Sequence, residues 1–248
     1  MAPYDFAARR HYLSDDLAEG TEIVCNTSQA DYFVNVLRLK SGSTILVFNG
    51  RDGEWRAELS QVKRNDCTLT MLQQVRPQAS GPDIHYLFAP LKQARLDYMV
   101  QKATEMGVAV LRPVITQRTN VDGVNLERMR GNAIEAAEQC GILRIPMVEE
   151  PVKLGPVLDE WDPARALIYC DEAASEHSPV ETLAGVASGP MGVLVGPEGG
   201  FGTEEQDMLR RQSFVVPISL GPRVLRADTA AVAALALVNA VLGDWRSN

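Results

Sequence analysis

Short apolar runs broken by turn residues dominate the first 76 residues of the chain. The runs Ser43–Phe48, Glu54–Leu59 and Cys67–Leu72 contain β-branched or alternating apolar residues, which predicts three β-strands. Asn49-Gly50 and Asp52-Gly53 lie between the first two runs and supply residues that tolerate the positive φ of a hairpin turn. This part of the chain is therefore expected to be mainly β.

One helix is predicted within this β pattern. Phe33, Val36 and Leu37 recur at helical spacing and form an apolar face. Ser28 is placed to cap the helix, with Asp31 three residues further on. The first 76 residues thus predict a small β-barrel that carries one helix.

The segment 76–82 is the predicted domain boundary, because it contains two prolines and a glycine and has no apolar periodicity. Beyond it, strands and helices alternate, which is typical of a parallel sheet covered by helices. We therefore expect a first domain over residues 1–76 and an α/β domain over residues 83–248. The predicted strands are 84–89, 108–114, 167–170, 191–195 and 214–220, and the predicted helices are 94–106, 126–140, 181–187, 203–212 and 227–242.

Three of these helices carry further signals. Gly107 directly follows helix 94–106 and is a natural C′ residue. Thr203 with Gln206 has the spacing of a capping box at the start of helix 203–212. Helix 227–242 is apolar on nearly every side, so it must be buried in its own domain or against a second copy of the chain.

The composition is that of a soluble globular protein, with 46% hydrophobic and 23% charged residues among 248. Cys25, Cys67, Cys140 and Cys170 form no C-x-x-C pair, so zinc-ligand spacing is absent and we expect no metal. Reduced thiols in a cytoplasmic protein are the simplest interpretation. The sequence has no apolar stretch long enough for a membrane helix, so no membrane partner is expected.

The net charge of −8 argues against non-specific nucleic-acid binding by the chain as a whole. Residues 1–76 nevertheless hold nine Lys or Arg against ten Asp or Glu, whereas the rest of the chain holds 15 against 22. Arg9, Arg10, Arg38 and Arg51 are therefore our candidates for contacts with a phosphate backbone. Scattered solvated charges are the alternative interpretation.

A glycine-proline loop, Gly196–Gly200, lies between a predicted strand and a predicted helix. Ligands bind at the carboxyl ends of strands in open α/β sheets, and glycines let the backbone approach a ligand closely. The loop lacks both the Lys-Ser/Thr of a P-loop and the G-x-G-x-x-G spacing of a dinucleotide site, which disfavours a triphosphate or pyrophosphate ligand. A plain glycine-rich turn is the alternative.

A second loop, Gly221–Arg226, also lies between a strand and a helix, and the two loops form one crevice if their strands lie close together. Backbone groups there can bind the edge of an adenine without charged side chains. Arg223 and Arg226 are placed to clamp an anionic substrate. Asp228, in the first turn of the last helix, either acts in the site or only complements the helix dipole.

Taken in order, these motifs resemble the RsmE family of RNA methyltransferases in the SPOUT superfamily. The resemblance covers nearly the whole chain and is strongest at Leu194–Gly200 and Leu220–Arg226. Arg10, Lys92, 101–107 and 133–141 support it. It implies a PUA-like RNA-binding barrel over residues 1–76 and a trefoil-knotted SPOUT domain over residues 83–248. It also implies a homodimer through the C-terminal domain.

The resemblance further implies S-adenosylmethionine (SAM) as methyl donor and N3 of a uridine in 16S rRNA of the small ribosomal subunit as acceptor. It assigns an RNA contact to Lys92 beside the four arginines named above. The residues that it implies for cofactor binding are Leu194, Gly196, Pro197, Glu198, Gly199, Ile218, Leu220, Gly221, Val224 and Leu225.

Two positions depart from the family pattern. Ile142 stands where family members often carry Arg, and Arg144 follows two residues later, so the resemblance assigns no role to Arg144. Asp228 stands where Glu is common, which keeps the carboxylate but shortens it by one methylene.

The chemistry implied by the family narrows the catalytic candidates to Arg223, Arg226 and Asp228. Uridine N3 must lose a proton, which places negative charge on the ring oxygens, and an arginine can stabilise that charge. Asp228 or Glu198 is a candidate base if burial raises its pKa. Because the catalytic part is acidic, we expect the assembled subunit rather than free rRNA to be the substrate.

Two rival functions remain at this point. A Rossmann-like enzyme with a phosphate-bearing cofactor would use the same glycine loops, although its fingerprint is missing. An RNA-binding assembly factor without catalytic activity would keep the fold. Titration with SAM tests the first rival, and mapping of methyl marks on rRNA tests the second.

Overall fold

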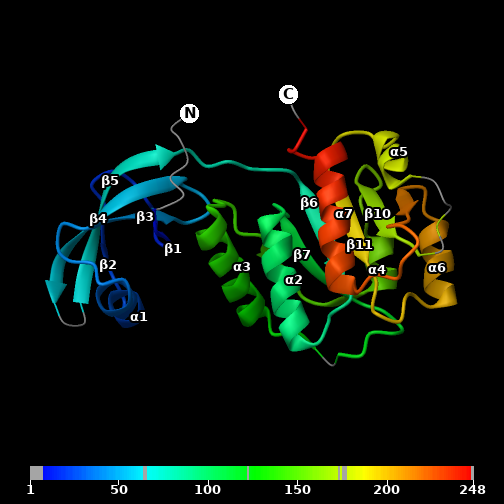
Figure 1. Cartoon of the computed structure of the whole chain (residues 1–248), viewed down its shortest axis with the longest axis horizontal. Helices are drawn as coiled ribbons and strands as arrows, with labels where there is room; N and C mark the ends of the chain where they lie inside the picture. The colour runs from blue at the N-terminus through cyan, green and yellow to red at the C-terminus, as the bar shows by residue number, and fades with distance from the viewer. Residues whose placement is uncertain (1–7, 64–65, 122, 173, 175–177, 247–248) are drawn as a thin grey trace. The chain divides into compact units, whose positions relative to one another are not determined.

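The computed structural model describes residues 8–63, 66–121, 123–172, 174 and 178–246. The contacts within the chain divide it into two compact units, whose residues can be followed by colour in Figure 1. The first unit comprises Met1–Ser80 with Ala137–Arg144, and the second comprises Gly81–Ala136 with Ile145–Asn248. No helix in the described part of the chain is long and apolar enough to cross a membrane.

The first unit is built on a five-stranded sheet. Its order is β1 (Arg10–Tyr12), β3 (Thr44–Phe48), β4 (Glu54–Lys63), β5 (Asp66–Arg76) and β2 (Glu22–Val24), with β1 parallel to β3 and the other pairs antiparallel. The three predicted strands are confirmed. The sequence did not predict β1 and β2, because three residues are too few to show alternation.

The predicted hairpin turn between β3 and β4 is confirmed by its backbone angles. Gly50 and Gly53 have φ of 82° and 79°, in the left-handed region that favours glycine. A Cβ on Gly53 would also overlap the carbonyl oxygen of Arg76, so this turn requires glycine for space as well as for conformation.

The predicted helix forms, with a different start. Helix α1 (Thr27–Asp31) is capped by Asn26, whose side chain accepts a hydrogen bond from the Gln29 N–H while the Gln29 side chain accepts from the Asn26 N–H. The prediction of Ser28 as cap was therefore wrong, since the capping box begins two residues earlier. The chain continues as a π-helical turn, η1 (Tyr32–Val36).

Arg10 requires a correction to its predicted role as a phosphate contact. Its side chain is 3% exposed and donates from Nε to Glu54 Oε1 at 2.8 Å. Arg76 donates to the same carboxylate, at 2.7 and 2.9 Å. A buried guanidinium in such a pair holds β1 to β4 and β5, because removing either partner would leave a buried charge uncompensated.

The second unit contains a parallel sheet in the order β12-β10-β11-β6-β7-β8, with β9 paired to β7. This confirms the α/β prediction. The strands are β6 (Ile84–Phe88), β7 (Val110–Ile115), β8 (Met147–Val148), β9 (Val152–Lys153), β10 (Ala166–Cys170), β11 (Met191–Val195) and β12 (Val215–Ile218).

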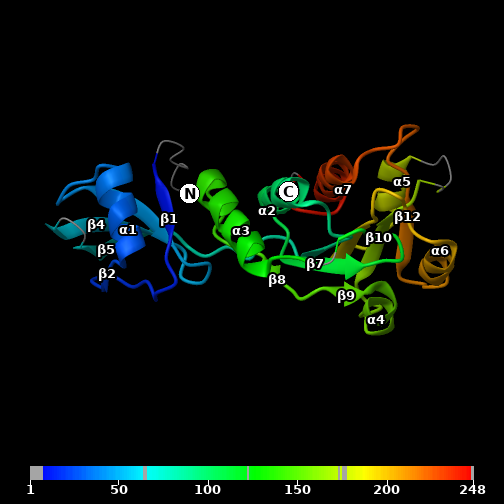
Figure 2. The same ribbon diagram turned by 90° about the horizontal axis from the view of Figure 1, so that it is seen from below.

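Helices cover both faces of this sheet (Figure 2). One core joins the sheet to α2, α3, α5 and α7, and the other joins it to α4 and α6. Neighbouring strand residues divide between the two cores, as in β11, where Val193 belongs to the first and Leu194 to the second. The helices are α2 (Gln93–Glu105), α3 (Leu126–Cys140), α4 (Leu154–Asp159), α5 (Pro179–Ala184), α6 (Thr203–Arg210) and α7 (Ala227–Val241).

Helix ends match the predictions in part. Gly107 follows α2 with φ of 77°, as predicted for a C′ glycine. Helix α6 instead begins after Gly202, whose N–H donates to Glu205 Oε2 at 2.9 Å, so the predicted pairing of Thr203 with Gln206 was wrong. Helix α7 buries one apolar face, and its Asn239 side chain donates to the Met106 carbonyl at 2.9 Å.

Candidate functional site

Strand β10 lies between β11 and β12 in the sheet and is parallel to both. The two glycine-proline loops therefore leave strands that are not adjacent, because β10 separates them; the prediction required only that these strands lie close together. All three strands point the same way, so the chain leaves all three at one edge of the sheet. Ligands of open α/β sheets bind at this edge.

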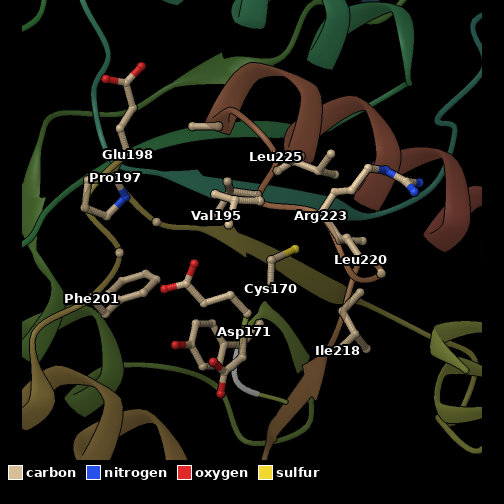
Figure 3. Close-up of a pocket in the computed structure, with 18 of the residues that line it drawn as sticks. Cys170, Asp171, Val195, Pro197, Glu198, Phe201, Ile218, Leu220, Arg223 and Leu225 are labelled. Carbon is tan, nitrogen blue, oxygen red and sulfur yellow. The ribbon is translucent and has the colours of Figure 1, made fainter. Parts of the chain in front are cut away.

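An open cavity lies at this edge (Figure 3). Its walls come from the end of β10, the loop after β11, the loop after β12 and the start of α7. The lining residues are Tyr169, Cys170, Asp171, Glu172, Val195, Gly196, Pro197, Glu198, Gly200, Phe201, Gln206, Ile218, Leu220, Gly221, Arg223, Val224, Leu225, Ala227 and Ala230.

The cavity brings together most of the residues predicted to bind a cofactor. Of the ten, only Leu194 and Gly199 are absent from its lining. The Leu194 side chain is fully buried in the core on the α4 and α6 side of the sheet. The Gly199 carbonyl accepts a hydrogen bond from Arg118 Nη1 at 2.6 Å, and Arg118 does not line the cavity.

Sequence reasoning missed the contribution of β10, which is the segment Tyr169–Glu172. The strand itself was predicted, but nothing in the sequence gives its place between the other two. With that strand order known, the same rule about carboxyl ends would have identified these residues.

The loop after β11 is shaped by glycines. Gly200 has φ of 70°, and its N–H donates to the Pro197 carbonyl at 2.8 Å, which closes a tight turn. A Cβ on Gly196 would overlap the ring of Phe201. That ring is buried and packs edge-on against Tyr169, with centroids 5.3 Å apart. Phe201 thus ties the loop to the end of β10.

Two of the three carboxylates in the lining already have cationic partners. Asp171, whose side chain is 2% exposed, accepts from Arg210 Nη2 at 3.0 Å, and this pairing raises the pKa of Arg210. Glu198 forms an ion pair with Arg95 at the start of α2. These pairs fix two walls of the cavity.

Burial governs the two other titratable side chains at the end of β10. It raises the pKa of the Cys170 thiol to about 12, so this cysteine is a thiol rather than a thiolate at neutral pH. Burial and the nearby Asp171 raise the pKa of the Tyr169 hydroxyl as well. Neither group is suited to act as a nucleophile.

The predicted catalytic residues lie in the loop after β12 and in the first turn of α7, and only one of them lines the cavity. Gly221 has φ of 98° and makes the turn. Arg223 is exposed and lines the cavity. Arg226, at the N-cap position of α7, is exposed and lies outside the lining, as does the half-buried Asp228.

The residues predicted to contact RNA do not form one cluster. Arg9 and Arg38 are exposed in the first unit. Arg51, in the same unit, is paired with Asp16 at 2.7 Å. Lys92 is exposed in the second unit, directly before α2. In the described residues, no group of three or more His, Cys, Asp or Glu side chains could hold a metal ion.

Comparison with known families defines the class of protein. Residues 78–239 match the RNA methyltransferase domain family, and residues 26–72 match the RNA methyltransferase PUA domain family. The first match contains every element that builds the cavity. The chain thus contains an RNA methyltransferase domain preceded by a PUA domain of the kind found in RNA methyltransferases.

Individual relatives narrow this class. A protein from Rickettsia conorii named ribosomal RNA small subunit methyltransferase E is 30% identical over 231 residues, which cover 92% of this chain and 94% of the relative. A Synechocystis protein of the same name is 29% identical over 233 residues, covering 92% and 76%. The chain belongs to the ribosomal RNA small subunit methyltransferase E family.

Solved methyltransferase structures confirm the predicted α/β fold over nearly the whole chain. A putative methyltransferase from Legionella pneumophila, solved with the cofactor SAM, has a TM-score of 0.83 and 29% identity and covers 96% of this chain and 99% of its own. A ribosomal RNA small subunit methyltransferase E from Neisseria gonorrhoeae bound to SAM has a TM-score of 0.84 and 25% identity, covering 96% and 100%. The trefoil knot stays a prediction.

Gly196 and Gly199 of the first loop should respond differently to an added methyl group. Gly196→Ala should lower the free energy of unfolding by about 1–3 kcal/mol, because the new Cβ overlaps the buried Phe201 ring. Gly199→Ala is the matched control, since its Cβ would lie 3.5 Å from Arg118 Cδ, an ordinary contact. Urea unfolding measures both, and equal stability of the two variants would contradict this account.

Proposed function

We propose that this chain transfers a methyl group from SAM to N3 of a uridine in 16S rRNA of the small ribosomal subunit. The observation that carries the proposal is the cavity itself. Two glycine-proline loops and the end of β10 form it within the residues that match the RNA methyltransferase domain. The similar Legionella and Neisseria structures, both bound to SAM, support this choice of cofactor.

The lining suits SAM. Val195, Ile218 and Leu220 supply apolar walls, and Gly196 and Gly221 expose backbone groups that can bind a base edge. We assign cofactor binding to the ten residues implied by the family, eight of which line the cavity. When bound, SAM supplies an electrophilic methyl carbon on its sulfonium, so catalysis rests on alignment of the acceptor nitrogen with that carbon.

We assign transition-state stabilisation to Arg223 and Arg226. A uridine held outside base pairing presents N3 with its proton, and loss of that proton leaves negative charge on the ring oxygens. Guanidinium groups can stabilise such a charge, and Arg223 lines the cavity three residues before Arg226. Asp228 is assigned as the group that takes the N3 proton, because it lies in the first turn of α7, two residues after Arg226.

RNA binding is assigned to the domain of residues 1–76 and methyl transfer to residues 83–248. In the first unit, Arg9 and Arg56 line one open groove together with Leu39, Thr44 and Leu46. Both arginines are exposed, so the groove offers two cations to an RNA backbone. Arg38, Arg51 and Lys92 remain further candidates.

We also propose that the chain acts as a cytoplasmic homodimer through its C-terminal domain. Helix α7 leaves Val232, Leu237 and Val241 only half-buried, although Leu237 and Val241 also pack against the core of their own unit. A second copy of the helix would cover these apolar side chains.

A methylation assay tests the proposed function. Small subunits and naked 16S rRNA that lack the modification are incubated with labelled SAM, and the modified nucleoside is identified by mass and chromatography. We expect 3-methyluridine, formed faster on subunits than on naked rRNA. Absence of a mark on both substrates would contradict the function, a different nucleoside would contradict the N3 assignment, and faster reaction on naked rRNA would contradict the preference for the subunit.

Arg226→Ala should lower turnover by about 100-fold or more, with little change in SAM affinity. The physical reason is that Arg226 lies outside the cavity lining and is assigned to charge that develops on the uracil. Single-turnover rates and calorimetric titration separate the two effects. Equal losses in rate and in SAM affinity would show that Arg226 acts on the cofactor instead.

Arg9→Ala should lower the slope of log K for RNA binding against log salt concentration by about one, as expected for one lost phosphate contact. Binding of an rRNA fragment at several salt concentrations gives the slope. Arg130→Ala is the control, because Arg130 is an exposed arginine on α3 that pairs with Glu127. A slope that Arg9→Ala leaves at the wild-type value would remove Arg9 from the RNA-binding surface.

A further inference from the structure

Glu172 is a charged residue of the cavity that neither the sequence motifs nor the family assigns. It follows Cys170 and Asp171 at the end of β10, and it lines the cavity. Its Oε1 lies 3.3 Å from the position that a Cβ on Gly200 would occupy. The carboxylate therefore reaches from the central strand to the backbone of the loop after β11.

Glu172 differs from the other two carboxylates in the lining because no cationic side chain in the described part of the chain pairs with it. Asp171 is neutralised by Arg210, and Glu198 is neutralised by Arg95. Glu172 is exposed and forms no hydrogen bond or ion pair with any other residue that the structure describes. It therefore contributes an uncompensated negative charge to the cavity.

Arg223 is the cationic side chain of the lining that would have to compensate the negative charge of Glu172. It lines the same cavity from the loop after β12. Figure 3 shows its side chain running away from the side where Asp171 and Phe201 lie. The field of Glu172 is consequently strongest on the β10 side of the cavity, between the two loops.

We propose that Glu172 is a specificity residue that selects SAM over the demethylated product, S-adenosylhomocysteine. This inference rests on the proposed function. The two molecules differ in one methyl group and in one positive charge, since methyl transfer converts the sulfonium into a neutral thioether. A carboxylate without a protein partner favours the cationic form and loses that attraction once the methyl group has left. Glu172 thus holds the donor and favours release of the product.

The test compares three ligands by calorimetric titration: SAM, S-adenosylhomocysteine, and an analogue that carries a protonated amine in place of the methylated sulfur. Glu172→Gln should weaken SAM and the amine analogue about tenfold and change the affinity for S-adenosylhomocysteine by less than about twofold. Glu150→Gln is the matched control. Glu150 is exposed and follows β8, an edge strand that is separated from β10 by β11, β6 and β7, so all three affinities should stay at wild-type values.

Kinetics provide a second readout. A carboxylate beside the sulfonium stabilises the bound donor more than the transition state, in which that charge is being lost. Glu172→Gln should therefore raise KM for SAM and strengthen inhibition by the product relative to KM, without lowering kcat.

Each outcome decides between specific alternatives. Equal weakening of SAM and S-adenosylhomocysteine would overturn the proposal, because Glu172 would then bind a group that both share, such as the ribose hydroxyls or the ammonium. Unchanged affinity for all three ligands would also overturn it. Failure of the wild-type chain to bind SAM would instead contradict the proposed function itself, so the two failures are distinguishable.

Discussion

Parallel pairing of β10 with both β11 and β12 is the constraint on which the site depends. The registers place Tyr169 opposite Leu194 and Cys170 opposite Ile218, so the three strands end at nearly the same level. Three chain segments must then turn away from one edge within a few residues of each other. The glycine loops make two of these turns at close range, and the space between them becomes the cavity.

The alternation of side chains along these strands decides what each one can contribute to the cavity. In β11, Leu194 belongs to the core on the α4 and α6 side, whereas Val195, one residue later, reaches the cavity. In β10, Tyr169 packs on Phe201, and Cys170 lies on the opposite face. Successive side chains of a strand point to opposite faces of the sheet. A continuous sequence motif therefore includes residues such as Leu194, whose side chain points into the core and not into the cavity.

Local sequence patterns predict much of the fold and about half of the residues that line the cavity. Helix Leu126–Cys140 and strand Met191–Val195 match their predicted limits, because long or strongly apolar segments carry their own periodicity. Strand order, short strands such as β1, and the Arg10–Glu54 pair depend on contacts between distant residues. For the same reason the sequence identified the two glycine loops but missed Tyr169–Glu172, and it assigned Arg10 to a surface although it is buried.

The distribution of ion pairs separates rigid parts of the site from groups left for ligands. Arg95 and Arg210 hold two carboxylates of the wall, so these walls keep their shape without adding net charge. The loop after β11 is further fixed on its outer side, where Arg118 binds Gly199 and the Gln117 N–H binds Glu205. Glu172 and Arg223 are exposed and sit on different segments. In their proposed roles, these two residues give the cavity one charge suited to a cationic donor and one suited to an acceptor that becomes anionic.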